Sequence, residues 1–396
     1  MNLEQQDKKY VLQTYARDYT NFVKGVGSTL YDESGKDYID FASGIGVNSV
    51  GHGNEKLVSA ICEQAKNIIH ISNLQVIEPQ AKLAQKIVEL SGYDMGIFFA
   101  NSGAEANEGA IKIARKYGEI NFDEKRYKII TLEYSFHGRT ITTVKATGQK
   151  SFHTPHFSPY PAGFSYEKSI ADVYKAIDDE TVAVLIELVQ GEGGVQSFEK
   201  EEIQKLAAHL KAEGILLIVD EVQTGVYRTG EFLASNLYEI EPDIITLAKG
   251  LGGGVPIGAV MTKHKEVLSV GDHGSTFGGN YLSTSAGLAV LEVLEELYES
   301  GAIAEAHLYF EQKLENIVKQ YGNLFEKEVG LGLMRGLRAK SSEIQTAVQK
   351  QSFQEGLIIL KAGRNTVRFL PSITISKEEI DEGFKRFEMA LKKVHL

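Results

Sequence analysis

The sequence is poor in the residues that cross-link or break a fold. Its single cysteine, Cys62, has no second cysteine for an internal disulfide, and 396 residues include only 7 prolines and no tryptophan. Hydrophobic residues make up 43% of the chain, which excludes a wholly disordered protein. At about 150 residues per domain, the length predicts two or three packed domains.

Positive charge and long apolar runs are also scarce. The chain has 42 Lys and Arg against 53 Asp and Glu, a net charge of −11, which argues against a basic nucleic-acid-binding surface. The longest apolar runs, such as residues 215–219, fall far short of the ~20 residues that cross a bilayer. The first residues lack the basic start and apolar segment of a signal peptide. We therefore expect a cytoplasmic protein that binds neither nucleic acid nor membrane.

Short apolar runs rich in β-branched residues recur in the middle of the chain, with helical stretches between them. They cover residues 96–99, 128–132, 182–188, 215–219, 244–247 and 258–261. Several are apolar on both faces, which is typical of central strands in a mostly parallel sheet. These runs predict an α/β fold.

The regions on either side follow other patterns. Apolar spacing over residues 57–68 predicts an amphipathic helix, with Cys62 beside its buried face as a small core residue. From about residue 281 a long helix leads into a smaller α+β region, where a change of domain is expected. Strands are predicted there at residues 333–339, 357–361 and 367–375, and a closing helix at 380–391.

Three turns that follow predicted strands carry unusual chemistry, and ligands of open α/β sheets bind at this edge. The turn at residues 101–106 opens a helix whose free N–H groups and positive dipole end suit a phosphate. The second turn carries Asp220 and Gln223, and the third places Lys249 before a run of glycines. Taken singly, each has an ordinary alternative, such as a helix cap at Ser102 or a solvated surface lysine.

Other chemistries lack their motifs. The chain has no P-loop sequence, and Lys249 precedes its glycines instead of following them. The nearest approach to a dinucleotide-binding glycine motif has Ser49 where the third glycine belongs. His153 and His156 flank a Thr-Pro pair, which predicts a turn, so we expect no metal site. Pyridoxal 5′-phosphate (PLP) uses a lysine, a carboxylate for its ring nitrogen and a helix N-terminus for its phosphate, so we predict this cofactor.

A series of short motifs runs in order along nearly the whole chain. They are G-S-T-L-Y-D at Gly27, Y-I-D-F at Tyr38, N-S-G-A-E-A at Asn101, F-H-G-R-T at Phe136, Q-G-E-G-G at Gln190, D-E-V-Q-T-G at Asp220, A-K-G-L-G at Ala248, H-G-S-T-F-G-G-N at His273 and V-R-F-L-P at Val367. This series closely resembles the class III (ornithine-type) PLP-dependent aminotransferases. The resemblance implies the type I fold of PLP-dependent transferases and a homodimer whose subunits share the site. It also implies a large PLP-binding domain over residues 51–280 and a small α+β domain built from residues 1–50 and 281–396.

The resemblance implies a role in catalysis for two residues of this chain. Lys249 is expected to form the Schiff base with the cofactor aldehyde and to move the proton, and Asp220 to pair with the pyridinium nitrogen. Val222 and Phe136 would pack on opposite faces of the cofactor ring. Gln223 would donate a hydrogen bond to its phenolic oxygen.

The phosphate group has its own expected residues. The resemblance places it on the loop that begins at Ser102, against the N–H groups of Gly103 and Ala104. The partner subunit's Thr276 would complete this phosphate site. In the same motif as Phe136, His137 is expected to support Phe136 and the neighbouring arginine, with an acid–base role as the alternative.

Substrate choice is expected to depend on arginines, because a guanidinium binds a carboxylate in a bidentate manner. By resemblance, Arg368 holds the α-carboxylate of glutamate, and Glu192 pairs with Arg368 when the amino donor has no carboxylate there. Arg139 would hold a second carboxylate, and Ser275 would touch the same donor.

The expected reaction follows from these roles. We expect transfer of the δ-amino group of N2-acetyl-L-ornithine to 2-oxoglutarate, giving N-acetylglutamate 5-semialdehyde and glutamate in arginine biosynthesis. Ornithine, succinylornithine or N-succinyl-diaminopimelate as donor are alternatives, and a PLP-binding regulatory protein is the non-enzyme alternative. The sequence departs from the usual family pattern at Leu188, at Tyr227 and at Asn54-Glu55, all in loops near the expected site.

Overall fold

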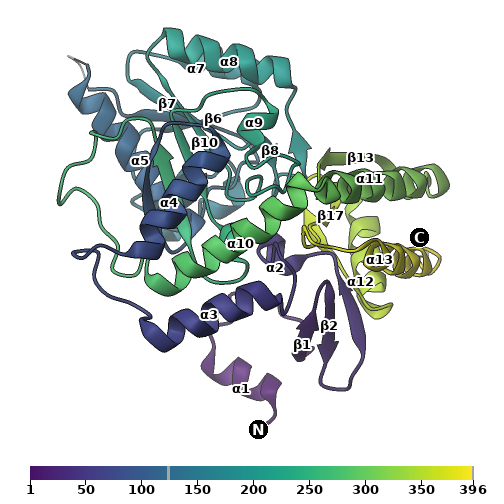
Figure 1. Cartoon of the computed structure of the whole chain (residues 1–396). Coiled ribbons are helices and arrows are strands. Elements are labelled where there is room, and N and C mark those ends of the chain that lie inside the picture. Colours follow the sequence, from purple (N-terminus) through teal and green to yellow (C-terminus); the bar gives the residue numbers. More distant parts are fainter. Residues whose placement is uncertain (123–124, 395–396) are drawn as a thin grey trace.

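The structure, a computed structural model, describes residues 1–122 and 125–394 and is built around a seven-stranded sheet (Figure 1). Among these residues the strand order is β4-β12-β11-β10-β7-β5-β6. Strand β12 runs antiparallel to both neighbours, and the other neighbouring pairs are parallel. The strands are β4 Gly96–Ala100, β5 Lys128–Leu132, β6 Phe164–Glu167, β7 Thr181–Ile186, β10 Leu216–Asp220, β11 Ile244–Leu247 and β12 Gly258–Thr262. The predicted α/β fold with a mostly parallel sheet is confirmed.

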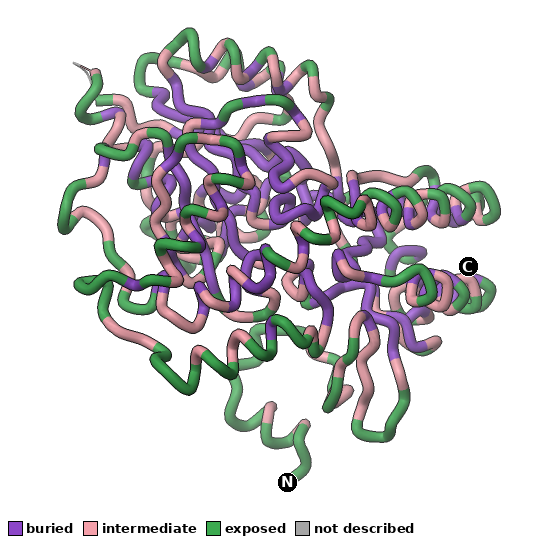
Figure 2. The backbone as a smooth tube through the Cα atoms, in the orientation of Figure 1, coloured by how far each residue is buried: buried purple, intermediate pink, exposed green. Residues whose placement is uncertain are grey.

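This sheet is buried on both faces, as the purple core in Figure 2 shows. In β7 every residue is buried, and successive side chains enter different hydrophobic clusters. Val184 shares a cluster with Leu206 of α8 (Lys200–Ala212), whereas Leu185 packs in the cluster that contains α5 (Gly103–Ile120). Burial on both faces explains why the central strands are continuous apolar runs rather than alternating ones.

Most predicted strands of the large sheet match the structure within one or two residues. The run at 182–188 ends early, at Ile186, because the chain turns there and Val189–Gln190 (β8) pairs with Gln196–Ser197 (β9) in a separate sheet. Strand β6 is not among the predicted strands, because its half-buried residues at the sheet edge form no apolar run.

Both ends of the chain meet in two smaller sheets beside the large one (Figure 1). One sheet joins β1 Phe22–Val26, β2 Thr29–Asp32 and β3 Asp37–Asp40 to β15 Leu357–Ile358; the other contains β13 Phe325–Leu331, β14 Met334–Ala339, β17 Thr366–Phe369 and β16 Leu360–Ala362. The helices α11 Ala302–Gln320, α12 Ser342–Gln354 and α13 Lys377–Leu391 pack against them. An aromatic core that includes Phe41 and Phe369 lies between these elements. Domain boundaries at residues 50 and 280 stay predictions.

Two predicted strands in this region are partly wrong. The one at 357–361 is split, because β15 pairs with β3 and β16 pairs with β17. The one at 367–375 ends at Phe369, because the N–H group of Leu370 donates to the carbonyl of Phe41 and Pro371 has no N–H to continue a ladder. The closing helix is confirmed as α13, with its predicted apolar face buried.

Three helices, α3 (Glu55–Asn67), α4 (Glu78–Ser91) and α10 (Tyr281–Glu299), pack together against the large sheet. The prediction that Cys62 is a small core residue is wrong, since its side chain is exposed. In α3 only Leu57 is buried, and Cys62 follows the half-buried Ile61 by about 100° of helix rotation, so it points away from α10.

The remaining elements are short. They are α1 Leu3–Tyr10, α2 Ser43–Gly46, α6 Ile141–Ala146, α7 Ile170–Ala176, α9 Ala234–Leu237 and the 3₁₀ turns η1 Lys150–Phe152, η2 Pro155–Phe157 and η3 Lys249–Gly252. Within the described residues, none of the helices combines the length and apolarity that a membrane span requires.

Candidate active site

A cavity of about 420 Å³ lies beyond the carboxyl ends of several strands of the large sheet. It brings together most of the residues that the sequence singles out: Ser102, Gly103, Ala104, Phe136, Arg139, Glu192, Asp220, Val222, Gln223 and Lys249. Strand ends are the expected place for a ligand in an open α/β sheet.

The start of α5 forms one wall of the cavity. Ser102 caps this helix, and its hydroxyl accepts a hydrogen bond from the N–H of Glu105 at 3.2 Å. The N–H groups of Gly103 and Ala104 donate to no other described residue, as expected in the first turn of a helix. A Cβ at Gly103 would lie 2.7 Å from Val222, so the close approach of these two walls requires glycine.

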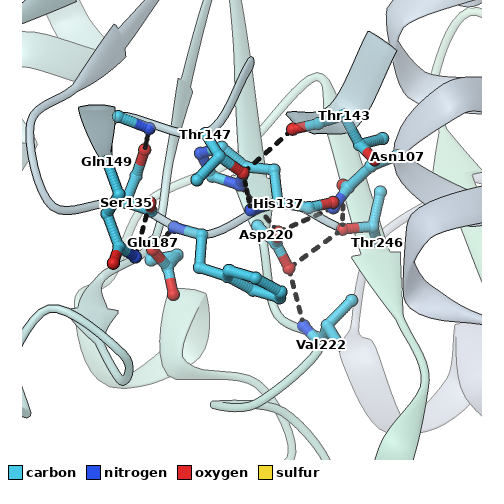
Figure 3. Close-up of polar contacts among 12 residues, drawn as sticks. Asn107, Ser135, His137, Thr143, Thr147, Gln149, Glu187, Asp220, Val222 and Thr246 are labelled. Atoms are coloured by element: carbon cyan, nitrogen blue, oxygen red, sulfur yellow. Dashed lines mark hydrogen bonds and ion pairs between the residues drawn. The ribbon is translucent and has the colours of Figure 1, made fainter. Parts of the chain in front are cut away.

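Asp220, the last residue of β10, is the centre of a buried hydrogen-bond network (Figure 3). Its carboxylate accepts hydrogen bonds from His137 Nδ1 at 2.8 Å, from Asn107 Nδ2 at 2.8 Å and from the N–H of Val222 at 3.0 Å. Burial alone would raise the pKa of Asp220, but hydrogen bonds and charge from His137, together with Asn107, outweigh it and lower this pKa. The site therefore holds a charged carboxylate.

His137 and Asn107 support Asp220 in a way that the sequence does not reveal. His137 is 1% exposed, and its ring contacts the carboxylate of a residue 83 positions away in the chain. Asn107 also accepts a hydrogen bond from Thr246 at 2.9 Å. The only sequence signal for Asn107 is a polar residue on the face of α5 that otherwise carries small apolar residues.

Lys249 follows β11 directly and lines the same cavity. Its φ of 42° is in the left-handed region, which a lysine rarely adopts, and such strain is common at functional sites. Burial lowers the pKa of Lys249 below its usual value, and the nearby carboxylate of Glu192 offsets this only in part. A larger fraction of the amine is thus neutral, and so nucleophilic, near pH 7.

Glu187 is a buried carboxyl in the cavity wall that is not among the predicted site residues. It follows the last residue of β7 and accepts a hydrogen bond from the N–H of Phe136 at 2.9 Å. Burial raises its pKa well above the usual value, and the charge of Asp220 raises it further. Its signal in the sequence is an acidic residue inside an otherwise apolar run.

We expect the pH dependence of stability to report on Glu187. Because its pKa is raised on folding, the native state keeps a proton that the unfolded chain releases above pH 4.5, so stability falls as pH rises through the folded pKa. Glu187→Gln keeps an oxygen for the N–H of Phe136 and cannot ionise. The Tm of the variant relative to wild type should therefore rise with pH above about pH 4.5, until the buried Glu187 ionises, in calorimetry of the cofactor-free protein. A Tm difference that does not change with pH would contradict the raised pKa.

Arg368, on β17, lies behind Glu192 and does not line the cavity itself. It is 2% exposed, and its Nη1 donates to Glu192 Oε1 at 2.7 Å and to Gln223 Oε1 at 3.3 Å. The expected pairing of Glu192 with Arg368 is thus present in the geometry. The contact with Gln223 is unexpected, because the sequence places Gln223 only against the cofactor.

Arg139 makes no ion pair or hydrogen bond with the described residues. Its guanidinium instead stacks on the ring of Phe152 at 3.8 Å and lies 5.4 Å from that of Phe136. A stacked guanidinium is held in place by its face while its N–H groups stay free for a carboxylate. Phe152 is a contact that the motifs do not indicate, because it lies outside them in η1.

Ser275 and Thr276 lie outside this cavity. They line a separate hollow on the other side of β4, and Ser275 Oγ accepts a hydrogen bond from Asn101 Nδ2 at 3.2 Å. Within one described chain these two residues are therefore not brought to Lys249. The expected contacts of these two residues with the donor and the phosphate would have to be made in the cavity of a partner subunit.

The local structure explains two of the positions at which this sequence departs from the usual family pattern. Tyr227 has a φ of 64°, a conformation that favours the glycine usual in the family, and its buried ring packs on Phe232 and Tyr298. Asn54 caps α3, and its side chain accepts a hydrogen bond from the N–H of Leu57 at 3.1 Å. Leu188 is fully buried in the core next to α8.

A lysine, a buried carboxylate and an open helix N-terminus around one cavity define a PLP-type site. The family model of class-III aminotransferases matches residues 13–391, and the chain belongs to this family. The acetylornithine aminotransferase of Wolinella succinogenes is 60% identical over 98% of this chain and 99% of that protein. The succinylornithine transaminase of Yersinia pseudotuberculosis is 40% identical, over 98% and 95%.

Solved structures agree with this membership. The ornithine aminotransferase from Toxoplasma gondii, crystallised with PLP in partial occupancy at its active site, superposes with a TM-score of 0.91. It is 30% identical and covers 98% of this chain and 93% of that one. The present protein is accordingly a transaminase with PLP as its cofactor.

The residues of the cavity fit this cofactor. The free N–H groups at the start of α5 suit its phosphate, and the side chain of Asp220 is charged, as a protonated ring nitrogen requires. Lys249 reaches the same cavity.

Proposed function

We propose that the protein is an acetylornithine aminotransferase, which moves the δ-amino group of N2-acetyl-L-ornithine to 2-oxoglutarate in arginine biosynthesis. The observation that carries this proposal is the placement of two arginines: Arg139 lines the cavity without an acidic partner among the described residues, and Arg368 lies behind Glu192 and is paired with it. A donor with one carboxylate and a distant amine needs Arg139 for its carboxylate and does not need Arg368. The Wolinella succinogenes relative supports this choice.

The chain's own residues divide the work of the reaction. PLP supplies an electron sink for the bonds at the carbon that carries the transferred amine. In the proposal, Nζ of Lys249 would take a proton from that carbon and deliver it to the 4′ carbon of the cofactor, and the second half-reaction would reverse this transfer. Asp220, held by His137 and Asn107, would keep the ring nitrogen protonated. Val222 and Phe136 would lie against the two faces of the ring, and Gln223 would donate to its phenolic oxygen.

Glu192 is proposed to select between the two substrates. While acetylornithine reacts, its carboxylate lies on Arg139 and Glu192 neutralises Arg368. When glutamate binds, its α-carboxylate takes the place of Glu192 on Arg368. One cavity can thus bind a donor whose carboxylate is far from the reacting carbon, such as acetylornithine, and a donor whose carboxylate is next to that carbon, such as glutamate.

A homodimer forms part of the proposal. The phosphate would rest on the N–H groups of Gly103 and Ala104 and on the partner subunit's Thr276, and the partner subunit's Ser275 would touch the donor. What supports this is that one chain leaves its own Ser275 and Thr276 outside the cavity. A location in the cytoplasm stays a prediction.

Succinylornithine is a second candidate donor. The relative from Yersinia pseudotuberculosis acts on it by name, and the same Arg139 could bind its α-carboxylate. A panel of donors in single half-reactions, followed through the absorbance of the cofactor, tests both proposals. The highest kcat/KM should belong to acetylornithine, and a clear preference for succinylornithine or ornithine would overturn the first proposal.

We expect Arg139→Ala to weaken acetylornithine strongly and selectively. Loss of a bidentate carboxylate contact should lower kcat/KM for acetylornithine about 100-fold, mainly through KM. N-acetylputrescine, which is acetylornithine without its carboxylate, should react equally with wild type and variant. Half-reaction kinetics with the two donors measure this difference. Equal losses for both would remove Arg139 from carboxylate binding.

A further inference from the structure

The turn that connects β16 to β17 has an unusual conformation. The N–H of Thr366 donates to the carbonyl of Gly363 at 3.2 Å, and the two residues between them, Arg364 and Asn365, have φ values of 52° and 54°. Two successive positive φ values occur in type I′ turns, which prefer Asn and Gly. The positive φ strains the backbone of Arg364, and strain of this kind is common where a side chain has a functional role.

This turn holds the backbone of the loop that carries Glu192. The N–H of Gly363 donates to the carbonyl of Glu192 at 2.8 Å, and Arg364 Nη1 donates to the carbonyl of Gly193 at 2.6 Å. A Cβ at Gly363 would lie 3.0 Å from the carbonyl oxygen of Glu192, so the two backbones are in close contact. The guanidinium of Arg364 also stacks on the ring of Tyr134 at 4.0 Å.

Further contacts hold the end of the same loop. Arg338 Nη2 and Thr366 Oγ1 donate to the carbonyl of Gly194 at 3.2 and 3.1 Å, and Arg338 Nη1 donates to the carbonyl of Arg364 at 2.7 Å. The carbonyls of three successive residues, Glu192 to Gly194, are thus all bound by the strand pair that bears Arg368. The loop is thus held by one backbone N–H and three side chains, all of which donate to its backbone carbonyls.

The side chain of Glu192 is held by fewer contacts than its backbone. It is partly exposed, at 30%, and its only ion pair or hydrogen bond among the described residues is the 2.7 Å pair with Arg368. A carboxylate on a fixed backbone can leave Arg368 by rotation about its own bonds, and it returns to the same position. A loop free to move would let the pair loosen, since the energy of an ion pair depends on its geometry.

From this arrangement we infer that Arg364 is a positioning residue for substrate selection: it fixes the loop so that only the side chain of Glu192 moves when the carboxylate of glutamate replaces it on Arg368. The inference rests on the proposed function, because it assumes a donor that leaves Arg368 to Glu192. Arg364 lies outside the cavity and would act on substrate choice only through the loop that carries Glu192.

The test uses Arg364→Gly in the full-length enzyme with cofactor. Glycine accepts the positive φ and removes the side chain, so the fold should be kept, with an unchanged cofactor spectrum and an unchanged or raised Tm. The ratio of kcat/KM for glutamate to that for acetylornithine should rise about 3- to 10-fold, the effect of losing one hydrogen bond, and the change should be in KM. Arg364→Lys should restore part of the original ratio.

Asn365→Gly is the matched control, because it makes the same backbone change one residue further along while Arg364 stays. This variant should keep the wild-type ratio. In a Glu192→Ala background, Arg364→Gly should change the ratio no further, since the side chain that it positions is gone. An equal shift in Asn365→Gly, or a full shift in the Glu192→Ala background, would overturn the inference.

The inference and the proposed function fail in different ways. If wild type does not use acetylornithine, the function is wrong, and the ratio is measured with the preferred donor of the panel instead. If wild type uses acetylornithine and Arg364→Gly slows both half-reactions equally, the function stands and the role of Arg364 is wrong.

Discussion

Lys249→Ala is expected to abolish transamination while the protein still binds its cofactor. Among the described residues the cavity wall contains no second lysine, so no other amine there can replace Lys249 as the anchor and proton carrier. Loss of a general acid–base group costs about 100- to 10,000-fold, and loss of the covalent anchor adds to this, so turnover should fall by at least about 10,000-fold. Steady-state kinetics measure the loss, and the cofactor spectrum reports binding.

The anchor itself can be identified chemically. Borohydride reduction of the wild-type enzyme, followed by peptide mass spectrometry, should find the cofactor on Lys249. Lys265→Ala serves as the control, because this exposed lysine contacts only Asp94 at the surface, and its loss should leave turnover unchanged. Label on another lysine, or a Lys249→Ala enzyme that retains a tenth of its activity, would refute the assignment.

Asp220→Asn is expected to have the second largest effect. The substitution removes the negative charge that keeps the ring nitrogen protonated but leaves the shape of the side chain nearly unchanged. Loss of one preorganised electrostatic contact in a buried site typically costs about 100- to 1,000-fold in kcat, and we expect a loss of that size. His137 Nδ1 and Asn107 Nδ2 both donate to Oδ2 of Asp220, and asparagine can keep an oxygen there only by turning its NH2 towards the N–H of Val222, so the network would be weakened without opening a cavity.

A partly buried carboxylate before β11, at the other end of the same sheet, gives a control that separates this effect from lost stability. Asp243 accepts a hydrogen bond from the N–H of Leu217 at 2.7 Å and pairs with Lys263, and its pKa is lowered by hydrogen bonds that outweigh burial. Asp243→Asn should lower Tm but keep the kcat of the folded enzyme. If Asp220→Asn loses no more kcat than Asp243→Asn, Asp220 has only a structural role.

Local chemistry made much of the site predictable. The small residues after β4, the carboxylate after β10 and the lysine after β11 stand next to strands that their own apolar pattern reveals. Because ligands of open α/β sheets bind at strand ends, the sequence predicts that these three turns converge on one site. The cavity does contain residues from all of them.

Contacts between distant residues were beyond such prediction. His137 and Asp220 are 83 residues apart, and nothing in their flanking residues indicates a 2.8 Å contact. Likewise Phe152 stacks on Arg139 only because the fold brings η1 against the loop that carries this arginine. The error at Cys62 has a related origin, since periodicity identifies a helix more reliably than it decides which neighbouring element covers each face.

The sequence by itself determined the fold class, the family and most of the residues that gather around the cavity, because these depend on periodicity and on ordered local motifs. Only the tertiary structure decided how these residues are held. The charge of Asp220, the raised pKa of Glu187 and the fixed loop under Glu192 arise from burial and from hydrogen bonds that join separate elements. Such contacts depend on the positions of whole strands and helices relative to one another, which no local pattern encodes.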